Sequence, residues 1–313
     1  MKRFLTASVL FIILIPLFLV PVLKPVLESV FILLAIMAMI ELFNMYDTEK
    51  KIPLGMRIFA IILMLILYAA ILNTIPQCSD TIIVKFLRLI HLNNILSIVV
   101  ALALIFIIFM SSLVFVKNFT IKDLGEIYIS IFYVAICISS LTALRNYGVR
   151  FIVYLFAITV LTDTFALVFG KLLGKHKMAP HVSPKKTWEG AIGGTLVATI
   201  VGFCIIYFYS YYSKFFHDGV EMEFFDTIFR YNEFKLEFGK IVFIILLTVA
   251  LSVSSQVGDL VASKLKRSFG IKDYSNVFPG HGGVLDRFDS AFFAGTIFLV
   301  FILVEQQLFP WIG

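Results

Sequence analysis

Four aspartates lie in unusually apolar parts of the C-terminal half of the chain. Asp163 lies within one apolar run, and Asp259 lies within another, in the string GDLVASKLKR, one helical turn before Ser263. Asp286 and Asp289, in LDRFDS, are three residues apart and therefore share one face of a helix. Helix N-capping would explain these last two but neither of the others. A carboxylate at such depth is costly unless it is paired, hydrated or bound to a metal, so the pattern indicates a functional site.

Two strings rich in basic residues accompany the aspartates. GKLLGKHKMAPHVSPKKTWEG contains no acid between Lys171 and Trp188, and SKLKRSFGIKDYSNVFPGHGGVLDR holds only Asp273 and Asp286. Glycine pairs let backbone amides approach an anion, and lysine or arginine neutralises phosphate oxygens. Carboxylates repel phosphate, so both sets of residues make sense when a divalent cation lies between them. The sequence therefore predicts phosphoryl or nucleotidyl transfer assisted by such a cation.

Several other kinds of site are excluded by the spacing of their residues. The segment Gly170–His176, GKLLGKH, resembles a P-loop but is one residue short and lacks the Ser or Thr that would hold magnesium. Its two glycines fit a small-xxx-small helix contact equally well. The strings HExxH and GxSxG are absent, and the histidines are too dispersed for a zinc site. The scattered cysteines, Cys78, Cys137 and Cys204, form neither a disulfide framework nor a metal cluster.

The composition predicts an all-α, polytopic integral membrane protein. Of 313 residues, 60% are hydrophobic and 15% charged, and the mean hydropathy is +1.00. Soluble domains are about half apolar and a quarter charged, and a spanning helix needs about 20 mostly apolar residues. The run after Lys2 and Arg3 is expected to be an uncleaved first helix rather than a signal peptide. About nine spans are predicted, near Phe4–Leu23, Val26–Phe43, Ile58–Ile75, Ile95–Val116, Leu124–Leu144, Phe151–Phe169, Ala191–Tyr211, Ile241–Ala262 and Phe288–Leu308.

The distribution of lysine and arginine predicts the orientation of these spans. Basic loops alternate with less basic ones in a way that places the N-terminus and the loops 171–189 and 263–287 in the cytoplasm. The acidic segment Tyr212–Lys240 is then external, whereas Arg145 and Arg150 disagree with this map. Thr81–Leu92 is expected to be an interfacial amphipathic helix rather than a loop. We divide the chain into an N-terminal transmembrane region, 1–147, and a C-terminal catalytic transmembrane region, 148–313.

The two strings resemble the signatures of the phosphatidate cytidylyltransferases, or CDP-diacylglycerol synthases. The string S-x-L-K-R-x-x-x-x-K-D-x-x-x-x-x-P-G-H-G-G-x-x-D-R-x-D runs from Ser263 to Asp289. D-T-x-A-x-x-x-G-K-x-x-G-K-H and S-P-K-K-T-W-E-G lie upstream, between Asp163 and Gly190. The motifs cover about Asp163 to Ser290, and the N-terminal half resembles the family in hydropathy alone.

The resemblance implies that CTP condenses with phosphatidate to give CDP-diacylglycerol and pyrophosphate. It implies Mg²⁺ as cofactor, leaves a second, monovalent cation open, and suggests a bacterial cytoplasmic (inner) membrane with the site facing the cytoplasm. Membrane lipids are the expected surroundings, no nucleic acid is expected, and a homodimer is left open. The alternatives are a related polyprenol or lipid kinase and a secondary transporter with intramembrane carboxylates.

The resemblance also assigns site residues. Asp259 and Asp286 are the first expected metal ligands, and Asp163 and Asp289, expected near them, are further candidate ligands. Lys266, Arg267, Arg287 and His281 join the two ligands as expected catalytic residues, with loop positioning the favoured role of His281. The expected substrate-binding residues are Ser183, Lys185, Lys186, Ser263, Lys272, Gly282 and Gly283.

Overall fold

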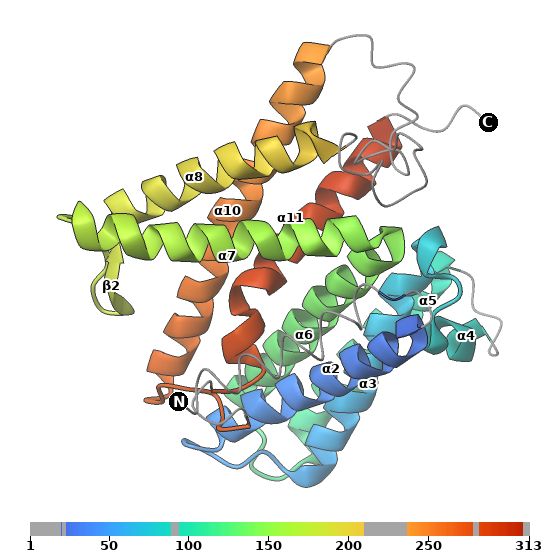
Figure 1. Ribbon diagram of the computed structural model, residues 1–313. Helices are drawn as coiled ribbons and strands as arrows, with labels where there is room; N and C mark the ends of the chain where they lie inside the picture. Colours follow the sequence, from blue (N-terminus) through green and yellow to red (C-terminus); the bar gives the residue numbers. More distant parts are fainter. Residues whose placement is uncertain (1–19, 21–22, 89–93, 210–236, 278–281, 309–313) are drawn as a thin grey trace. The chain divides into compact units, whose positions relative to one another are not determined.

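The computed structural model describes residues 20, 23–88, 94–209, 237–277 and 282–308 (Figure 1). Within these ranges, eight helices are long and apolar enough to cross a membrane, and they coincide within a few residues with eight of the nine predicted spans. Most of the first predicted span, Phe4–Leu23, lies outside the described residues. The eight helices are α2 (Lys24–Tyr46), α3 (Leu54–Asn73), α5 (Asn94–Phe115), α6 (Ile121–Tyr147), α7 (Val149–Leu172), α8 (Trp188–Tyr207), α10 (Glu237–Ser268) and α11 (Leu285–Leu308).

Prolines mark the starts of two of these helices. Helix α2 has Pro25 in its first turn and α3 starts directly after Pro53, positions at which the missing N–H of proline costs nothing.

Two shorter helices, η2 (Pro76–Cys78) and α4 (Ile82–Arg88), connect α3 to α5. Helix α4 confirms a helix within the predicted segment Thr81–Leu92, of which residues 89–93 lie outside the described part. Its location at the membrane interface stays a prediction.

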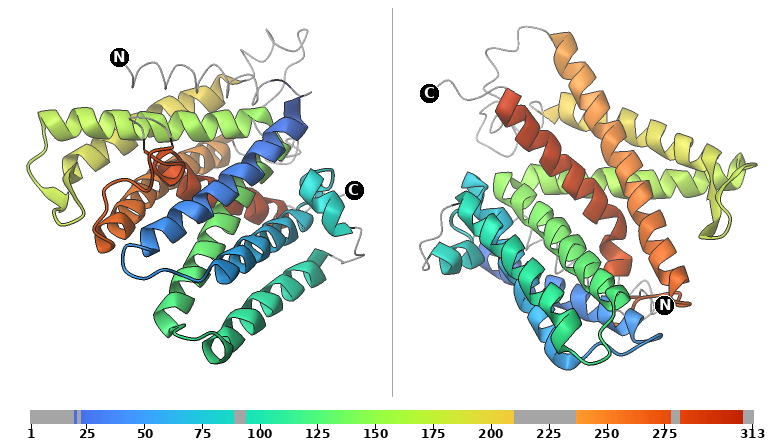
Figure 2. Two further views of the ribbon diagram at one scale, coloured as in Figure 1. Left: turned by 90° about the horizontal axis from the view of Figure 1, so that it is seen from below. Right: turned by 180° about the vertical axis from the view of Figure 1, so that it is seen from behind.

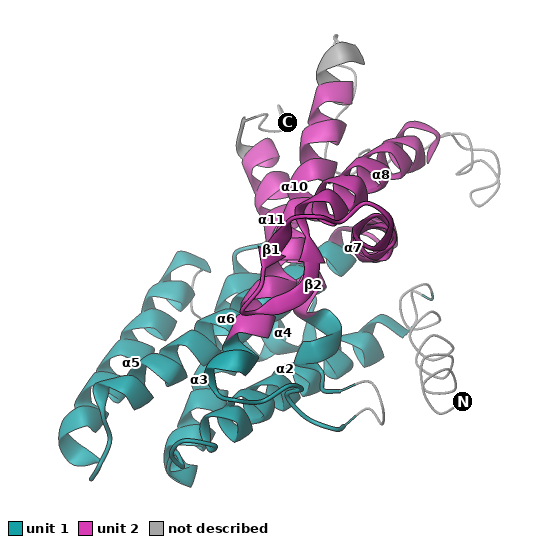
Figure 3. Cartoon of the chain, turned by 90° about the vertical axis from the view of Figure 1, so that its left-hand side faces the viewer, with its two compact units in different colours: residues 1–146, 265–288 teal, residues 147–264, 289–313 magenta. Residues whose placement is uncertain are grey.

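The chain divides into two compact units, which are coloured separately in Figure 3. Unit 1 comprises residues 1–146 and 265–288, and unit 2 comprises residues 147–264 and 289–313. Helices α10 and α11 each contribute residues to both units. The segment 265–288, which belongs to the predicted catalytic region, thus groups with the N-terminal helices. The assignment of catalysis to residues 148–313 stays a prediction.

Unit 1 is built around α2, α3 and α6. Helix α3 packs against α2, α4 and α5, and the views in Figure 2 show α5 running beside α3. Fully buried apolar side chains such as Phe31 and Met39 of α2 form its core. The buried hydroxyl of Tyr68 on α3 is hydrogen bonded to Thr142 of α6 at 2.9 Å, which satisfies both polar groups within the apolar interior.

In unit 2, helices α7 and α8 pack side by side at very short range (Figures 1 and 2). A methyl group added at Gly190 would lie 2.6 Å from the carbonyl oxygen of Ala166, and one at Gly194 would lie 2.6 Å from that of Thr162. Only glycine lets two helix backbones approach so closely at these positions. Helix α10 joins this pair through buried hydroxyls, since Thr162 donates to Ser252 at 2.9 Å.

The basic segment between α7 and α8 contains a small antiparallel hairpin of strands β1 (Lys177–Ala179) and β2 (Ser183–Thr187). Val182 donates its amide to the carbonyl of Ala179 at 3.1 Å, and Pro180 occupies the second position of this turn, where proline is favoured. From the sequence, only a loop is expected here. Strands of three and five residues in a polar, lysine-rich segment carry no hydrophobic alternation, so the pattern gave no strand signal.

Candidate active site

The hairpin is fastened at its base to the first turn of α8. Thr187 caps this helix, because its hydroxyl accepts the amide of Gly190 at 3.2 Å. The carboxylate of Glu189 accepts the His176 amide at 3.1 Å and contacts the His176 ring nitrogen Nδ1 at 2.6 Å. In return, the amide of Trp188 donates to the carbonyl of His176 at 3.0 Å. The string TWEG therefore holds both ends of the hairpin, which carries three of the predicted substrate-binding residues, Ser183, Lys185 and Lys186.

Strand β2 directs one of its two neighbouring lysines at a predicted metal ligand. The ammonium of Lys186 lies 2.5 Å from the carboxylate of Asp259 on α10, and these side chains are 24% and 29% exposed. It also contacts the carbonyl of Gln256 at 3.4 Å. Lys185 is exposed, because adjacent residues of a strand point to opposite faces. Ser183, at the start of β2, is partly buried.

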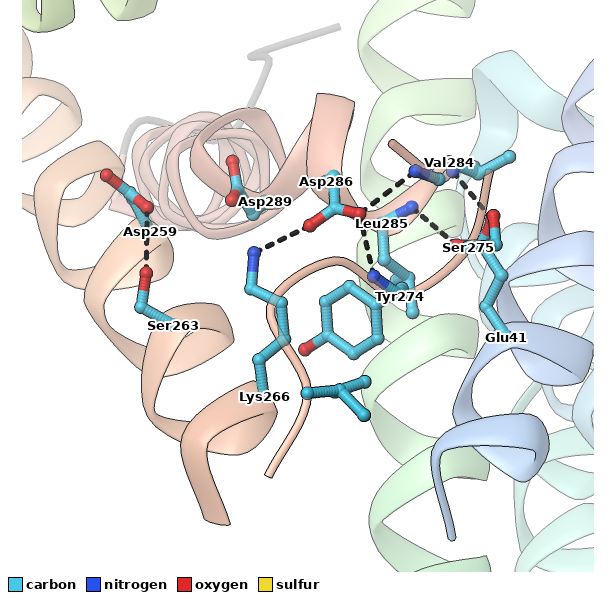
Figure 4. A network of polar contacts seen from close by, with 12 residues as sticks. Glu41, Asp259, Ser263, Lys266, Tyr274, Ser275, Val284, Leu285, Asp286 and Asp289 are labelled. Atoms are coloured by element: carbon cyan, nitrogen blue, oxygen red, sulfur yellow. Dashed lines mark hydrogen bonds and ion pairs between the residues drawn. The ribbon is translucent and has the colours of Figure 1, made fainter. Parts of the chain in front are cut away.

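Asp259 also accepts a hydrogen bond from Ser263, one turn later on α10, at 3.3 Å, as its spacing predicted (Figure 4). Two other predicted ligands of unit 2, Asp163 and Asp289, both approach the hydroxyl of Ser290. Their carboxylate oxygens lie 3.4 and 3.5 Å from it. Asp163 and Asp259 are also close enough to repel each other, and Lys186 attracts Asp163. Unit 2 therefore brings several carboxylates and one lysine together.

In unit 1, the end of α10 places Lys266. The amides of Gly270 and Ile271 donate to the carbonyls of Arg267 and Lys266 at 3.2 and 3.0 Å, and Gly270 has a positive φ of 69°. This is the Schellman arrangement, in which a glycine ends the helix. Lys266 is thereby fixed in the last turn of α10, and its ammonium lies 5.2 Å from the centre of the Tyr274 ring.

Asp286, the second residue of α11, is surrounded by donors from the same unit (Figure 4). Its Oδ1 accepts from Lys266 at 2.6 Å, and the two side chains are only 12% and 5% exposed. Its Oδ2 accepts the amides of Tyr274 and Gly283, both at 2.9 Å. A largely buried ion pair of this kind is favourable only with additional hydrogen bonds, which the two amides supply.

Gly282 and Gly283 allow the loop to pass close to carboxylates. Gly282 has a φ of 81°, and a methyl group there would lie 2.7 Å from the Oδ2 of Asp286. A methyl group at Gly283 would collide with the carboxylate of Glu41 on α2. The amide of Gly283 thus reaches the carboxylate of Asp286. The predicted contact of the glycine pair with a substrate phosphate stays a prediction.

The remaining predicted site residues lie at the surface of unit 1 or outside the described part. Arg267, Lys272 and Arg287 are exposed, and Arg267 donates to the carbonyl of Ile271 at 3.2 Å. His281 lies in the segment 278–281, outside the described residues, so its predicted positioning role stays a prediction.

The donor set suits Mg²⁺. Within the described residues, no group of three or more His, Cys, Asp or Glu side chains could hold a metal ion together. Mg²⁺ is usually bound by one or two carboxylates, with substrate phosphates and water completing its shell. Each oxygen of Asp259 accepts one bond from the protein, and so does the Oδ1 of Asp286. A carboxylate oxygen can accept two, so both aspartates fit such a role.

Two polar residues that contact the predicted site cannot be found from the motifs alone. Glu41 in α2 is a buried carboxylate within an apolar run, and the rule that singled out Asp163 would have found it. Gln256 in α10 donates to Thr195 and to the carbonyl of Ala191 at 2.9 and 3.2 Å, while its own backbone carbonyl faces Lys186. A neutral amide inside a helix gives no comparable signal in a sequence.

The fold and the site together define a helical membrane protein in which lysines are paired with carboxylates, an arrangement suited to phosphate chemistry. The model of the cytidylyltransferase family matches residues 1–304. The chain belongs to this family, as its strings predicted, and it is a nucleotidyltransferase. The match includes the N-terminal half, where the sequence analysis found a resemblance in hydropathy alone.

Several staphylococcal relatives are named phosphatidate cytidylyltransferase. That of Staphylococcus aureus (strain COL) is 34% identical over 262 residues, which cover 83% of this chain and 84% of that protein. That of Staphylococcus haemolyticus (strain JCSC1435) is 37% identical over 192 residues, which cover 61% of this chain and 64% of that protein. That of Staphylococcus epidermidis (strain ATCC 12228 / FDA PCI 1200) is 33% identical over 261 residues, with 83% and 84% covered.

Proposed function

We propose that this chain is a phosphatidate cytidylyltransferase, which condenses CTP with phosphatidate to give CDP-diacylglycerol and pyrophosphate. The observation that carries the proposal is that two lysines of the family strings are each paired with an aspartate. Lys186 lies 2.5 Å from Asp259, and Lys266 lies 2.6 Å from Asp286. Each pair combines a side chain suited to a phosphate with a side chain suited to a cation, which are the two requirements of a magnesium–nucleotide complex.

The proposed reaction is an in-line displacement between two anionic substrates. An oxygen of the lipid phosphate attacks the α-phosphorus of CTP in line, the new P–O bond forms, and the bond to the β-phosphate breaks to release pyrophosphate. The attacking phosphomonoester is already anionic near neutral pH, so no residue has to remove a proton from it. The protein then has to orient two polyanions and neutralise their charge, which is the role proposed for the lysines.

Asp259 and Asp286 are each proposed as ligands of Mg²⁺, and Asp163 and Asp289 are proposed as further candidates. Bound there, the ion would polarise the α-phosphate and stabilise the charge on the leaving pyrophosphate. The lysine partners orient both carboxylates, and they become available to phosphate oxygens when a cation takes their place. Lys186 and Lys266 therefore have a role both without a bound cation, when they pair with the carboxylates, and with one, when they contact phosphate.

The site is proposed to face the cytoplasm of a bacterial cytoplasmic membrane. The basic residues that flank α7, α10 and α11 support this orientation, because positive loops remain on the cytoplasmic side. CTP is supplied there, whereas phosphatidate reaches the protein within the membrane.

The position of the label in CTP tests the proposed reaction. Purified protein in detergent, given phosphatidate, magnesium and CTP labelled at the α-phosphorus, should produce a labelled lipid. CTP labelled at the γ-phosphorus should give labelled pyrophosphate and an unlabelled lipid. Diacylglycerol in place of phosphatidate lacks the phosphate nucleophile and should give no product. Transfer of the γ-label to lipid would instead identify a lipid kinase, and a lipid free of both labels would reject both enzymes.

A further inference from the structure

Glu41 is a buried carboxylate in the last third of helix α2. It is 2% exposed and lies within the apolar string AIMAMIELF. Its Oε1 accepts the hydroxyl of Ser275 at 2.6 Å and the amide of Val284 at 2.8 Å, and its Oε2 accepts the amide of Leu285 at 2.9 Å (Figure 4). All three donors belong to the loop between α10 and α11 or to the first residue of α11, more than 230 positions later in the chain.

These bonds account for a charge in such a place. A buried carboxylate is costly unless hydrogen bonds replace its hydration. The amides of Val284 and Leu285 stand at the start of α11, where the first N–H groups of a helix have no partner within the helix and where the dipole favours an anion. The side chain of Glu41 therefore caps the N-terminus of α11, although it belongs to the distant helix α2.

The end of α2 also contacts the opposite end of the same loop. Thr48 donates its hydroxyl to the carbonyl of Phe269 at 3.3 Å, and the ring of Tyr46 packs edge-on against the Phe269 ring, 5.1 Å between centres. Phe269 directly follows α10. Helix α2 and the turn after it thus hold the loop both where it leaves α10 and where it enters α11.

The anchored residues are immediate neighbours of the predicted chemistry. Leu285, which donates to Glu41, precedes Asp286, and Gly283 donates to Asp286 itself. A backbone shift at Val284 and Leu285 would therefore move the carboxylate that faces Lys266. Displacements of about 1 Å at a reacting centre can cost about a hundredfold in rate.

We propose that Glu41 is a positioning residue for nucleotidyl transfer, acting through the backbone of Val284 and Leu285 to fix Asp286 beside Lys266. The proposal rests on the proposed function for the identity of the reaction, whereas the anchoring itself can be measured without any substrate. It assigns a role in the reaction to a helix of the N-terminal half, in which the sequence analysis found no motif.

Glu41→Gln is the test variant, because it keeps the size of the side chain and removes one acceptor. The nitrogen of the introduced side-chain amide cannot accept from a backbone N–H, so one anchor bond is lost. Hydrogen exchange, followed by mass spectrometry on the protein in detergent, should become at least about tenfold faster in the peptide containing Val284 and Leu285. The kcat should fall at least about tenfold, with the KM values for CTP and phosphatidate changed less than about threefold.

Glu28→Gln is the matched control. Glu28 is also a buried carboxylate of α2, 6% exposed, and it accepts the amide of Ile82 at the start of α4 at 3.1 Å. Glu28 is the same type of residue in the same helix, but the amide that it accepts belongs to α4 and not to Val284 or Leu285. This variant should exchange faster at Ile82, keep wild-type exchange at Val284 and Leu285, and retain its kcat within about twofold.

Each outcome decides the proposal. Faster exchange at the loop together with a lower kcat, both absent from Glu28→Gln, supports it. Unchanged exchange at Val284 and Leu285 would refute the anchoring, and faster exchange with a normal kcat would refute the positioning role. A wild-type protein that forms no CDP-diacylglycerol would reject the proposed function while the exchange experiment still reports on the anchor.

Ser275→Ala carries the test if Glu41→Gln does not accumulate as folded protein. It removes one donor to Glu41 and leaves the buried carboxylate with its two amides. Exchange in the loop should then rise and kcat should fall, each by at least about twofold, since a single hydrogen bond contributes less than the full anchor. Wild-type values for both would overturn the proposal.

Discussion

Lys185 and Lys186 are adjacent in sequence and differ completely in surroundings. Both are expected to bind substrate, because two neighbouring lysines in one motif cannot be told apart by residue type. Strand β2 separates them, with Lys185 exposed and Lys186 directed at Asp259 and the carbonyl of Gln256. At the scale of single residues, the backbone therefore decides which lysine serves the site.

We expect Lys186→Ala to reduce kcat/KM by about 10- to 100-fold, the range that corresponds to a hydrogen bond with a charged group. The variant also leaves Asp259 without its cation. Lys185→Ala is the matched control and should remain within about threefold of wild type. Steady-state rates of CDP-diacylglycerol formation over a range of CTP concentrations measure both. Equal losses in the two variants would show that the orientation of β2 does not determine their roles.

The predicted site residues show what residue types alone can reveal. Asp163 and Asp259 stand out because charge in apolar sequence is rare, and Ser263 because it lies one turn after Asp259. Asp286 stands out because it shares a helix face with Asp289 and lies in a family string. Glu41 was overlooked although it obeys the same rule as Asp163. The donors that surround Asp286 could not be foreseen, because two of them are backbone amides and backbone amides have no signature in a sequence.

Helices α7 and α8 show how small residues set the geometry of an element. Gly190 and Gly194 lie where any side chain would meet the backbone of α7. The hairpin that carries Lys186 connects the end of α7 to the start of α8. The separation of α7 and α8 therefore contributes to the position of a residue proposed to act in the reaction.

Gly194→Ala should destabilise the protein by about 1–3 kcal/mol, because the added methyl would lie 2.6 Å from the carbonyl of Thr162. Gly125→Ala is the control, since no heavy atom lies within 4 Å of the methyl position in α6. That change should be neutral or stabilising by up to about 1 kcal/mol, because alanine favours a helix. Thermal unfolding in detergent compares the two. A Gly194→Ala protein as stable as wild type would show that α7 and α8 can separate without cost.

Long apolar helices were the most predictable elements of this fold. Each satisfies its own backbone hydrogen bonds, so its approximate extent follows from composition. The hairpin was unpredictable, because it depends on Thr187, Glu189 and His176 bonding across the ends of two helices. The exact end of α10 likewise depends on the conformation of Gly270.

At the scale of the whole molecule, the family likeness extends over both halves of the chain, since the family model matches residues 1–304. The contacts of Glu41 give a physical reason why the family likeness should include the N-terminal half. Helix α2 supports the loop that the C-terminal strings identify as functional. The orientation of the molecule in the membrane remains a prediction from its charges.

Cysteine labelling tests this orientation. Single cysteines in place of Lys177 and Ser275 should react with an impermeant maleimide only from the cytoplasmic side, and one in place of Glu223, outside the described residues, only from the other side. Cys204 is exposed and should first be replaced by serine, whereas Cys78 and Cys137 are buried. Burial also raises the pKa of the Cys78 thiol to about 12, so it stays protonated and unreactive. Labelling of the two loops from opposite sides would contradict a common cytoplasmic face.

The most direct test of the account is a paired measurement on Asp259→Asn and Asp286→Asn. Thermal stability in detergent is compared with CTP-dependent product formation across a magnesium titration. The Asp259→Asn change keeps the size of the side chain, and the new amide oxygen can still accept from Ser263. We therefore expect a folded protein whose activity at ordinary magnesium is at least about a hundredfold lower. The Asp286→Asn protein should lose activity and also some stability, because Lys266 loses its partner.

Excess magnesium, or manganese, should restore part of the lost activity, since a weakened site is refilled by mass action. That rescue should be clearest for Asp259→Asn, where folding is least affected. Near-normal activity of both variants at ordinary magnesium would contradict the central claim that these carboxylates bind the cation used in the transfer.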